Sequence, residues 1–364
     1  MMSNPPQGRA DSVVDNKCYE LDPTIDPRWA EFVRNHPKSS VFHSVGWLEA
    51  LRHTYAYKPA SLTTSTTNEP LKNGIVFCRV KSWLTGDRLV ALPFSDHCQP
   101  LCDSAEESIF LIRALQHSLY PGNWKYLEIR PIDEQIGRLS EQAGFARSSR
   151  YFLHILDLQP QLNEIFRRLD KDSVQRRVLR AERAGLAEGC GQSSELLRHF
   201  YELFVLTRRR HSLPPAPYSW FRNLIECLGT AVEIRVAYFK KTPISAIVTV
   251  RFNNAVYYKY GGSNAQFNNL GATPWLLWNA VVNAKSHGAL SFDLGRTETD
   301  NPGLLAFKNH WVANPIHMAY WRYPGGTSSL ASGSFPSRLA KRVFALMPGG
   351  LLKVTGRMLY PHIG

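Results

Sequence analysis

Hydrophobic and polar positions form two kinds of pattern along the chain. One has the spacing of a helix and the other is typical of strands. Apolar residues recur at helical spacing over 108–120, 195–210 and 274–288, which predicts three amphipathic helices. Apolar runs rich in β-branched and aromatic residues over 232–239 and 244–252 predict strands. Both halves run through helices, a series of strands, a helix and further strands, although no segment repeats letter for letter. The pattern therefore predicts two similar units of mixed α/β structure.

The stretch 255–311 is the most informative part of the chain. An apolar strand ends in a loop rich in Gly and Asn, and Pro274 then begins a helix with Thr273 as its N-cap. A second strand follows at 290–294, then a polar loop and a turn at 306–308. N–H groups at the start of a helix are unpaired and carry partial positive charge. A strand, a glycine loop and a helix N-terminus in this order can hold an acyl or phosphoryl group.

The same stretch resembles the C-terminal half of the FemABX-like N-acyltransferases, a branch of the GNAT acetyltransferase superfamily. The matching features are a Tyr-x-Tyr-Gly strand end, a Ser-Asn loop, a Leu-Leu-Trp helix, a Phe-Asp-Leu-Gly strand and a Phe-Lys pair before an aromatic residue. The most similar pattern is that of the FemAB-type proteins found beside bacterial exopolysaccharide and exosortase loci. The resemblance implies an α/β (α+β) fold of two tandem GNAT-like domains, each a mixed, mostly antiparallel sheet flanked by helices.

Four parts are predicted along the chain. Residues 1–17 form a disordered leader, 18–160 the first GNAT-like domain, and 161–325 the second, which carries the donor and acyl-transfer motifs. Residues 326–364 form a basic amphipathic tail. Two interpretations of this tail stay open: it docks on the second domain, or it lies on an anionic membrane face.

Composition narrows the class of protein and its compartment. A net charge of +13 with 44% hydrophobic residues indicates a folded basic protein, and it fits nucleic acid, an anionic membrane face or a polyanionic substrate. The sequence has no apolar run long enough to span a membrane and no apolar core of a signal peptide. These features predict a cytoplasmic protein, with the inner face of the plasma membrane as the alternative place.

The cysteines carry no disulfide or metal signature. Six are scattered along the chain without the spacing of a disulfide framework, as in a reducing compartment. His97, Cys98 and Cys102 invite a zinc interpretation, but no second Cys or His pair completes a tetrahedral site. No metal is predicted.

The resemblance assigns catalytic roles to two positions. The Phe307-Lys308 pair matches the family's Phe-Lys motif, which places Lys308 at the oxyanion of the transition state and Phe307 at the substrate. Asp103 is the best match to the family's general base, which takes a proton from the acceptor amine, with Asp96 and His97 as competing candidates. The alternative interpretation makes Lys308 a surface lysine and the loop acids caps of backbone N–H groups.

Further substrate-binding candidates follow from the same motifs. A basic segment from residue 162 to 189 matches the family pattern at Arg176 and Arg177, which then face a negatively charged acceptor or a donor phosphate. The alternatives are a solvated helix or an RNA-binding surface. In the C-terminal motifs, four residues orient substrate or line the cleft, with the two tyrosines on one strand face: Tyr258, Tyr260, Asp293 and Arg296.

The predicted activity is an N-acyltransferase or aminoacyltransferase that forms an amide on an amine of a cell-wall (peptidoglycan) or exopolysaccharide precursor, linked to a nucleotide or a lipid. The donor is an aminoacyl-tRNA or an acyl-CoA, and no other cofactor is assigned. Residues 268–272 replace the usual Gly-x-Gly pyrophosphate loop, which disfavours acetyl-CoA, and a long coiled-coil arm for tRNA is missing. Two alternatives remain: a CoA-dependent GNAT N-acyltransferase, and a non-catalytic subunit of a polysaccharide or protein-sorting system.

Overall fold

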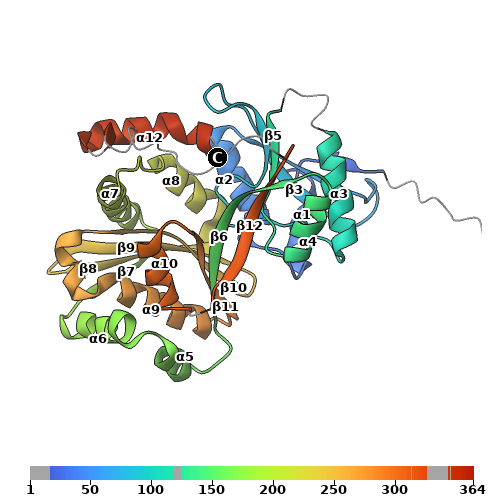
Figure 1. Cartoon of the computed structure of the whole chain (residues 1–364). Helices are drawn as coiled ribbons and strands as arrows, with labels where there is room; N and C mark the ends of the chain where they lie inside the picture. Colours follow the sequence, from blue (N-terminus) through green and yellow to red (C-terminus); the bar gives the residue numbers. More distant parts are fainter. Residues whose placement is uncertain (1–16, 119–123, 313, 326–342, 345) are drawn as a thin grey trace, which may run out of the picture.

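The computed structural model describes residues 17–118, 124–312, 314–325, 343–344 and 346–364 (Figure 1). In these residues twelve strands form one sheet, in the order β1-β2-β3-β4-β5-β12-β6-β11-β10-β9-β8-β7. The leader predicted for residues 1–17 lies outside the described residues except for Lys17, as does the tail segment 326–342.

The first half of the chain supplies one end of this sheet and the helices that cover it. Its elements are β1 (Tyr19–Leu21), α1 (Pro27–Asn35), η1 (Val41–His43), α2 (Val45–Tyr55), β2 (Lys58–Thr63), β3 (Ile75–Val80), β4 (Arg88–Ala91), α3 (Ala105–His117), β5 (Tyr126–Ile129), α4 (Glu134–Gln142) and β6 (Ala146–Asp157).

The second half supplies the other end. Its elements are α5 (Leu162–Arg168), η2 (Lys171–Gln175), α6 (Arg176–Arg183), β7 (Ala187–Gly191), α7 (Ser194–Arg210), α8 (Tyr218–Leu228), η3 (Gly229–Ala231), β8 (Val232–Phe239), β9 (Thr242–Phe252), β10 (Ala255–Ser263), η4 (Ala265–Leu270), α9 (Ala272–Ser286), β11 (Ser291–Glu298), α10 (Pro302–Asn309), β12 (Ile316–Tyr323) and α12 (Gly349–Ile363).

The same motif occurs once in each half. Among the described strands only β4–β5 and β10–β11 pair in parallel, and in both cases a helix, α3 or α9, connects the two strands. This repetition confirms the predicted mixed, mostly antiparallel architecture of two similar units. β12 lies between β5 and β6, so strands from both sides of the boundary predicted at residues 160–161 share the sheet.

The core joins the two halves. Figure 1 shows α7, α8 and α12 on one side of the strands β7–β10 and α6 and α9 on the other. On the first side, α2 packs on α8, and the rings of Trp47 and Trp220 meet edge to face at 5.4 Å. Both indoles are fully buried within one cluster that contains residues of both halves. The burial of this shared apolar surface holds the units together.

Local signals set most helix starts. Asp26 accepts a hydrogen bond from the Arg28 N–H at the start of α1, and Ser193 accepts one from the Leu196 N–H at the start of α7. Two local predictions are wrong. Residues 306–308 belong to the helix α10 and not to a turn, and the N-cap of α9 is Gly271 in place of Thr273.

Candidate active site

The candidate site lies where β10 and β11 separate. The two strands pair in parallel over Ala255–Tyr257 and Ser291–Asp293. Beyond these residues, β10 shifts its register after Tyr258 and β11 shifts its register after Asp293. Gly295 has a φ of +76°, a left-handed conformation that favours glycine, and a Cβ there would lie 3.1 Å from Oδ2 of Asp96. The bulges open the sheet beside this carboxylate.

The bulge in β10 changes which side chains share a face. Tyr258 packs with the apolar cluster under α9, whereas Tyr260 packs with the cluster under α7 and α8. The prediction that both tyrosines lie on one face is therefore wrong, because strict alternation fails at a bulge. Lys259 lies on the side of Tyr260, with its ammonium 4.6 Å from the ring centroid of Phe42.

An ion pair connects the two halves of the chain at this point. Nζ of Lys259 lies 2.5 Å from Oδ2 of Asp96, which follows β4 in the first half. The Lys259 side chain is 5% exposed and the Asp96 side chain 18%. Burial raises the pKa of Asp96, but Lys259 and the nearby Arg296 outweigh that effect and lower it to about 2. Asp96 is therefore ionised at neutral pH.

Lys308 projects from α10 into the same region. Its side chain donates two hydrogen bonds of 2.8 Å, to the carbonyl oxygens of Gly295 and Arg296 in the β11 bulge. Lys308 is only 4% exposed, so the interpretation as a surface lysine is ruled out. Burial lowers the pKa of Lys308 to about 8, although the carboxylates of Asp96 and Asp293 oppose this shift.

Arg296 and His97 complete the cluster of charged residues that Asp96, Lys259 and Lys308 begin. The Arg296 guanidinium lies over the ring of Tyr151 at 4.1 Å and over the ring of Tyr320 at 5.0 Å. Nε2 of His97 lies 3.2 Å from Oδ2 of Asp293, and both side chains are buried. Asp293 thus pairs with His97, and its other carboxylate oxygen accepts a hydrogen bond from the Gly295 N–H.

A cavity of about 180 Å³ lies at the N-terminus of α9. Two predicted substrate residues, Arg177 and Phe307, line it together with Ser263 and Thr273. Gly271, just before α9, has a φ of +78°, and a Cβ there would lie 2.3 Å from the Arg177 carbonyl oxygen. The loop is therefore packed tightly on α6, with the first N–H groups of α9 at the cavity.

The parallel pair of the first half carries its own group of charged residues. There Glu128 on β5 forms ion pairs of 2.8 Å with both Arg130 and Arg322, and Arg130 also donates to the Ser95 carbonyl oxygen at 3.1 Å. These contacts form a buried charged network at the parallel pair β4–β5.

Two predicted site residues lie apart from the cluster. Asp103 is exposed before α3, where its backbone N–H donates to Glu107 and its carbonyl accepts from Lys38. Arg176 forms an exposed ion pair with Asp172 within one helical turn. The contacts of both residues are those of solvated surface positions, and their predicted roles stay predictions.

Sequence reasoning missed three members of the cluster: Lys259, Tyr151 and Tyr320. Lys259 sits within the Tyr-x-Tyr-Gly motif, but a strict two-residue period assigned it to the wrong face. Tyr320 donates a hydrogen bond of 2.8 Å to the Asp96 carbonyl oxygen from β12, a strand that no motif announced. The bulged motif was a usable signal for Lys259, whereas the two tyrosines carry no local signal.

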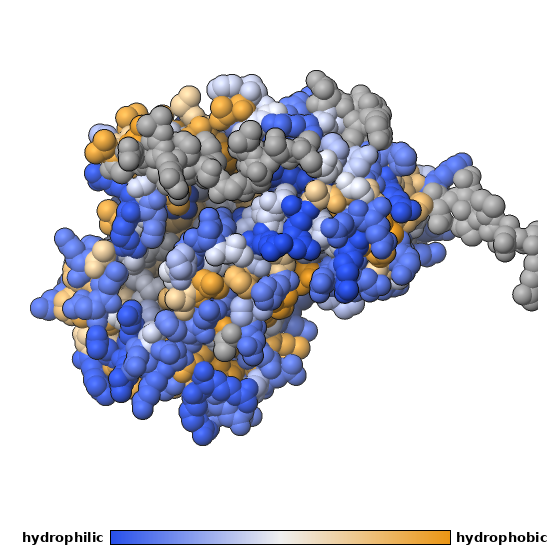
Figure 2. All heavy atoms as spheres, viewed as in Figure 1, coloured by the Kyte–Doolittle hydropathy of each residue, from blue (hydrophilic) through white to orange (hydrophobic). Residues whose placement is uncertain are grey.

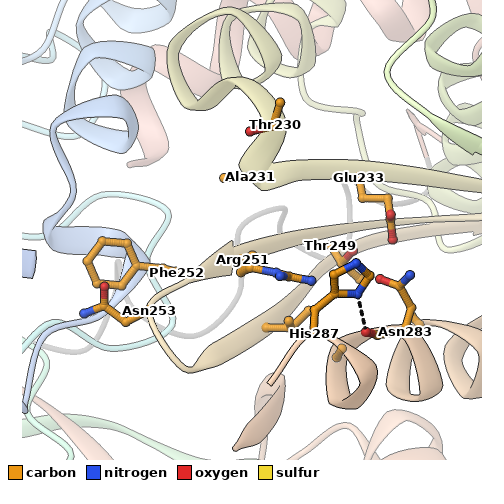
Figure 3. A pocket seen from close by; sticks show the side chains of 12 residues that line it. Thr230, Ala231, Glu233, Thr249, Arg251, Phe252, Asn253, Asn283 and His287 are labelled. Atoms are coloured by element: carbon orange, nitrogen blue, oxygen red, sulfur yellow. Dashed lines mark hydrogen bonds between the residues drawn. The ribbon is translucent and has the colours of Figure 1, made fainter. Parts of the chain in front are cut away.

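Another cavity lies elsewhere. About 660 Å³ in volume, it is lined by Glu233, Thr249 and Arg251 and by residues near the C-terminal end of α9, including His287 (Figure 3). It is thus at the opposite end of this helix from the cluster. Its labelled side chains come from η3, β8, β9 and the turn after it, and the C-terminal end of α9, and none of them was predicted as a site residue.

Within the described residues, no group of three or more His, Cys, Asp or Glu side chains is arranged to hold a metal ion. Among the helices described there, none combines the length and apolar character that crossing a bilayer requires.

One domain of the chain and its overall fold match known proteins. Residues 171–309 match the family described as an acetyltransferase (GNAT) domain. The crystal structure of FemX superposes with a TM-score of 0.67 at 15% identity, covering 84% of this chain and 97% of that chain. No curated protein sequence gives a significant match.

Two other solved structures have the same architecture. The C-terminal domain of a putative lysylphosphatidylglycerol synthetase from Agrobacterium fabrum has a TM-score of 0.57 at 13% identity, covering 84% of this chain and 93% of that chain. A tandem GNAT protein from the clavulanic acid biosynthesis pathway has a TM-score of 0.53 at 9% identity, covering 84% and 97%. Residues 171–309 therefore carry a GNAT domain, and the chain shares the fold of FemX and of a tandem GNAT protein, as the sequence motifs predicted.

Proposed function

We propose that this protein transfers an acyl or aminoacyl group onto an amine of a cell-wall or exopolysaccharide precursor. The observation that supports this most is that the cavity at the start of α9 and Lys308 adjoin in the second unit. The cavity at the start of α9 includes Phe307, and the next residue, Lys308, reaches the open part of the sheet. In this proposal, a donor held in the cavity would present its acyl carbon to the Lys308 ammonium and the Asp96–Lys259 pair.

Lys308 is suited to stabilising an oxyanion. An ammonium has three N–H donors, and two of them bind the carbonyl oxygens of the β11 bulge. The third N–H has no hydrogen-bond acceptor among the described residues. It is therefore free to bind the oxygen that becomes negative when the amine attacks the acyl carbon. Because the ammonium is already fixed and buried, little reorganisation is needed in the transition state.

The attacking amine must lose a proton, and His97 is the better placed acceptor. Its Nε2 lies 3.2 Å from Oδ2 of Asp293, which orients the ring. Asp96 is a poor acceptor since its pKa is lowered to about 2. Asp103, the other predicted base, lies on the surface before α3. We assign Asp96 to holding Lys259 and to the electrostatics of the site.

The donor is proposed to be an aminoacyl-tRNA or an acyl-CoA. Arg177 and the N-terminal N–H groups of α9 suit a phosphate, which both donors carry. The name of the Agrobacterium neighbour indicates that its product is a lysyl lipid, which favours an aminoacyl group and a lipid-linked acceptor. The precursor, linked to a nucleotide or a lipid, supplies the amine.

Thermal stability in the presence of ligands tests this assignment. Wild type and Lys308→Ala are melted with CoA thioesters, UDP-linked muropeptides, UDP-sugars and charged tRNA. A true substrate is expected to raise the melting temperature of the wild type and to raise that of the variant less. If no ligand shifts either protein, the transferase proposal gives way to the non-catalytic subunit.

The glycine before α9 offers a test of the donor cavity. Gly271→Ala is expected to lower kcat/KM for the donor by about tenfold or more, since the new Cβ pushes against the Arg177 carbonyl and displaces the helix N-terminus. Gly288→Ala is the matched control, with a φ of +81° and no atom within 4 Å of its Cβ. Equal kinetics for the two variants would remove the cavity from the donor site.

A further inference from the structure

One face of the C-terminal helix α12 is apolar and exposed. Leu351, Val354 and Met358 recur at helical spacing along it and are 52%, 54% and 67% exposed. Leu346, just before the helix, is 85% exposed. Figure 2 shows hydrophobic residues gathered along the edge of the molecule where α12 lies in Figure 1. A row of this kind marks an interaction surface more than scattered apolar residues do.

The opposite face of α12 is docked firmly on the protein. Leu352 and Gly356 are buried, and a Cβ on Gly356 would lie 2.1 Å from the Pro215 carbonyl oxygen. At the end of the helix, Arg88 donates hydrogen bonds to the carbonyl oxygens of His362 and Gly364. The helix is therefore held in place with its apolar row outward, which answers the question of whether the tail docks on the protein.

A second apolar element continues this row. The turn between β3 and β4 carries Trp83, which is 86% exposed, and Leu84, which is 43% exposed. The Trp83 ring lies 5.3 Å from that of His362, which is one helical turn beyond Met358. Trp83 and Leu84 come from the first half of the chain and the helix from its end, yet they form one continuous edge.

Cations surround this edge. Lys353 and Arg357 lie beside the apolar row and line a groove of about 610 Å³ between α12 and the helices α7 and α8. Arg198 also lines the groove, although it forms an exposed ion pair of 3.4 Å with Glu202. At the other end, Lys81 and Lys125 flank the Trp83 turn, with Nζ of Lys125 3.4 Å from the Thr85 carbonyl oxygen.

We propose that this edge is a docking surface for an anionic lipid bilayer. The surface consists of the apolar residues Trp83, Leu84, Leu346, Leu351, Val354 and Met358, together with the cations around them. Apolar side chains enter the boundary between headgroups and acyl chains, a tryptophan is favoured at that depth, and the lysines and arginines bind lipid phosphates. The charge favours a bilayer over an apolar protein partner. The surface is independent of the proposed transferase activity, but it would bring the site to lipid-linked precursors.

Sedimentation with vesicles tests the docking surface. The full chain is mixed with vesicles of phosphatidylcholine alone or of phosphatidylcholine with phosphatidylglycerol. It is expected to sediment mainly with the anionic vesicles, and less so as salt rises. The triple variant Trp83→Ser/Val354→Ser/Met358→Ser is expected to bind them about tenfold or more weakly. Ile25→Ser, at a 74% exposed residue before α1, is the matched control for loss of an apolar side chain.

Further variants separate the possible results. Lys353→Gln/Arg357→Gln leaves the apolar row intact and is expected to lose the preference for anionic vesicles. Lys308→Met is expected to bind vesicles like the wild type, so that failure of docking and failure of catalysis are told apart. Equal sedimentation of the wild type and the folded triple variant would overturn the proposal. So would light scattering that shows a dimer which the triple variant breaks.

Discussion

Replacing Lys308 by methionine is expected to lower kcat for amide formation by about a hundredfold to a thousandfold. This is the usual loss when one donor to a developing oxyanion is removed from a site that excludes water. Methionine keeps most of the side-chain volume but has no N–H, so the carbonyl oxygens of Gly295 and Arg296 lose their donor as well. KM for the donor is expected to change much less, because the cavity at α9 is lined by other residues.

The measurement is steady-state kinetics with the donor identified by thermal shifts. The control is Lys241→Met, an exposed lysine in the turn between β8 and β9, which is expected to keep wild-type kcat. Circular dichroism and melting curves establish that both variants are folded. A folded Lys308→Met protein with wild-type kcat would exclude Lys308 from the transition state.

Asp96→Asn is expected to destabilise the protein by about 3–5 kcal/mol, because it leaves the Lys259 ammonium buried without its counter-ion. Lys259→Met added to this variant is expected to restore part of that loss, since no charge is then buried. The difference measures the coupling between the two side chains. Asp172→Asn, which removes the exposed partner of Arg176, is expected to cost under about 0.5 kcal/mol.

The Asp96–Lys259 ion pair also predicts that the free energy of unfolding depends on pH in the acid range. The pKa of Asp96 is lowered from 3.8 to about 2 in the folded protein. The ionised carboxylate therefore contributes fully to the free energy of unfolding above pH 3.8. That contribution is lost as the pH falls through 2, and a shift of this size corresponds to about 2 kcal/mol. Urea unfolding of wild type and Asp96→Asn across this pH window measures it. Parallel pH curves for the two proteins would contradict the ion pair.

Hydrophobic periodicity and short motifs determined a large part of this structure in advance. The amphipathic helices at 108–120 and 195–210 correspond to α3 and α7, and the apolar runs at 232–239 and 244–252 correspond to β8 and β9. The reason is local: a helix or strand of this kind buries one face whatever covers it. Lys308 was singled out in another way, through the Phe-Lys pair that the family resemblance supplied, and the structure places it in the buried charged group.

Tertiary structure alone decided how these elements form a site. Asp96 meets Lys259 across 163 positions of sequence, and β12 enters the sheet between β5 and β6, where it places Tyr320 beside Asp96. Two bulges then moved side chains off the faces that alternation predicts. Register, bulges and strand order depend on which distant surfaces pack together, and no local pattern carries that information.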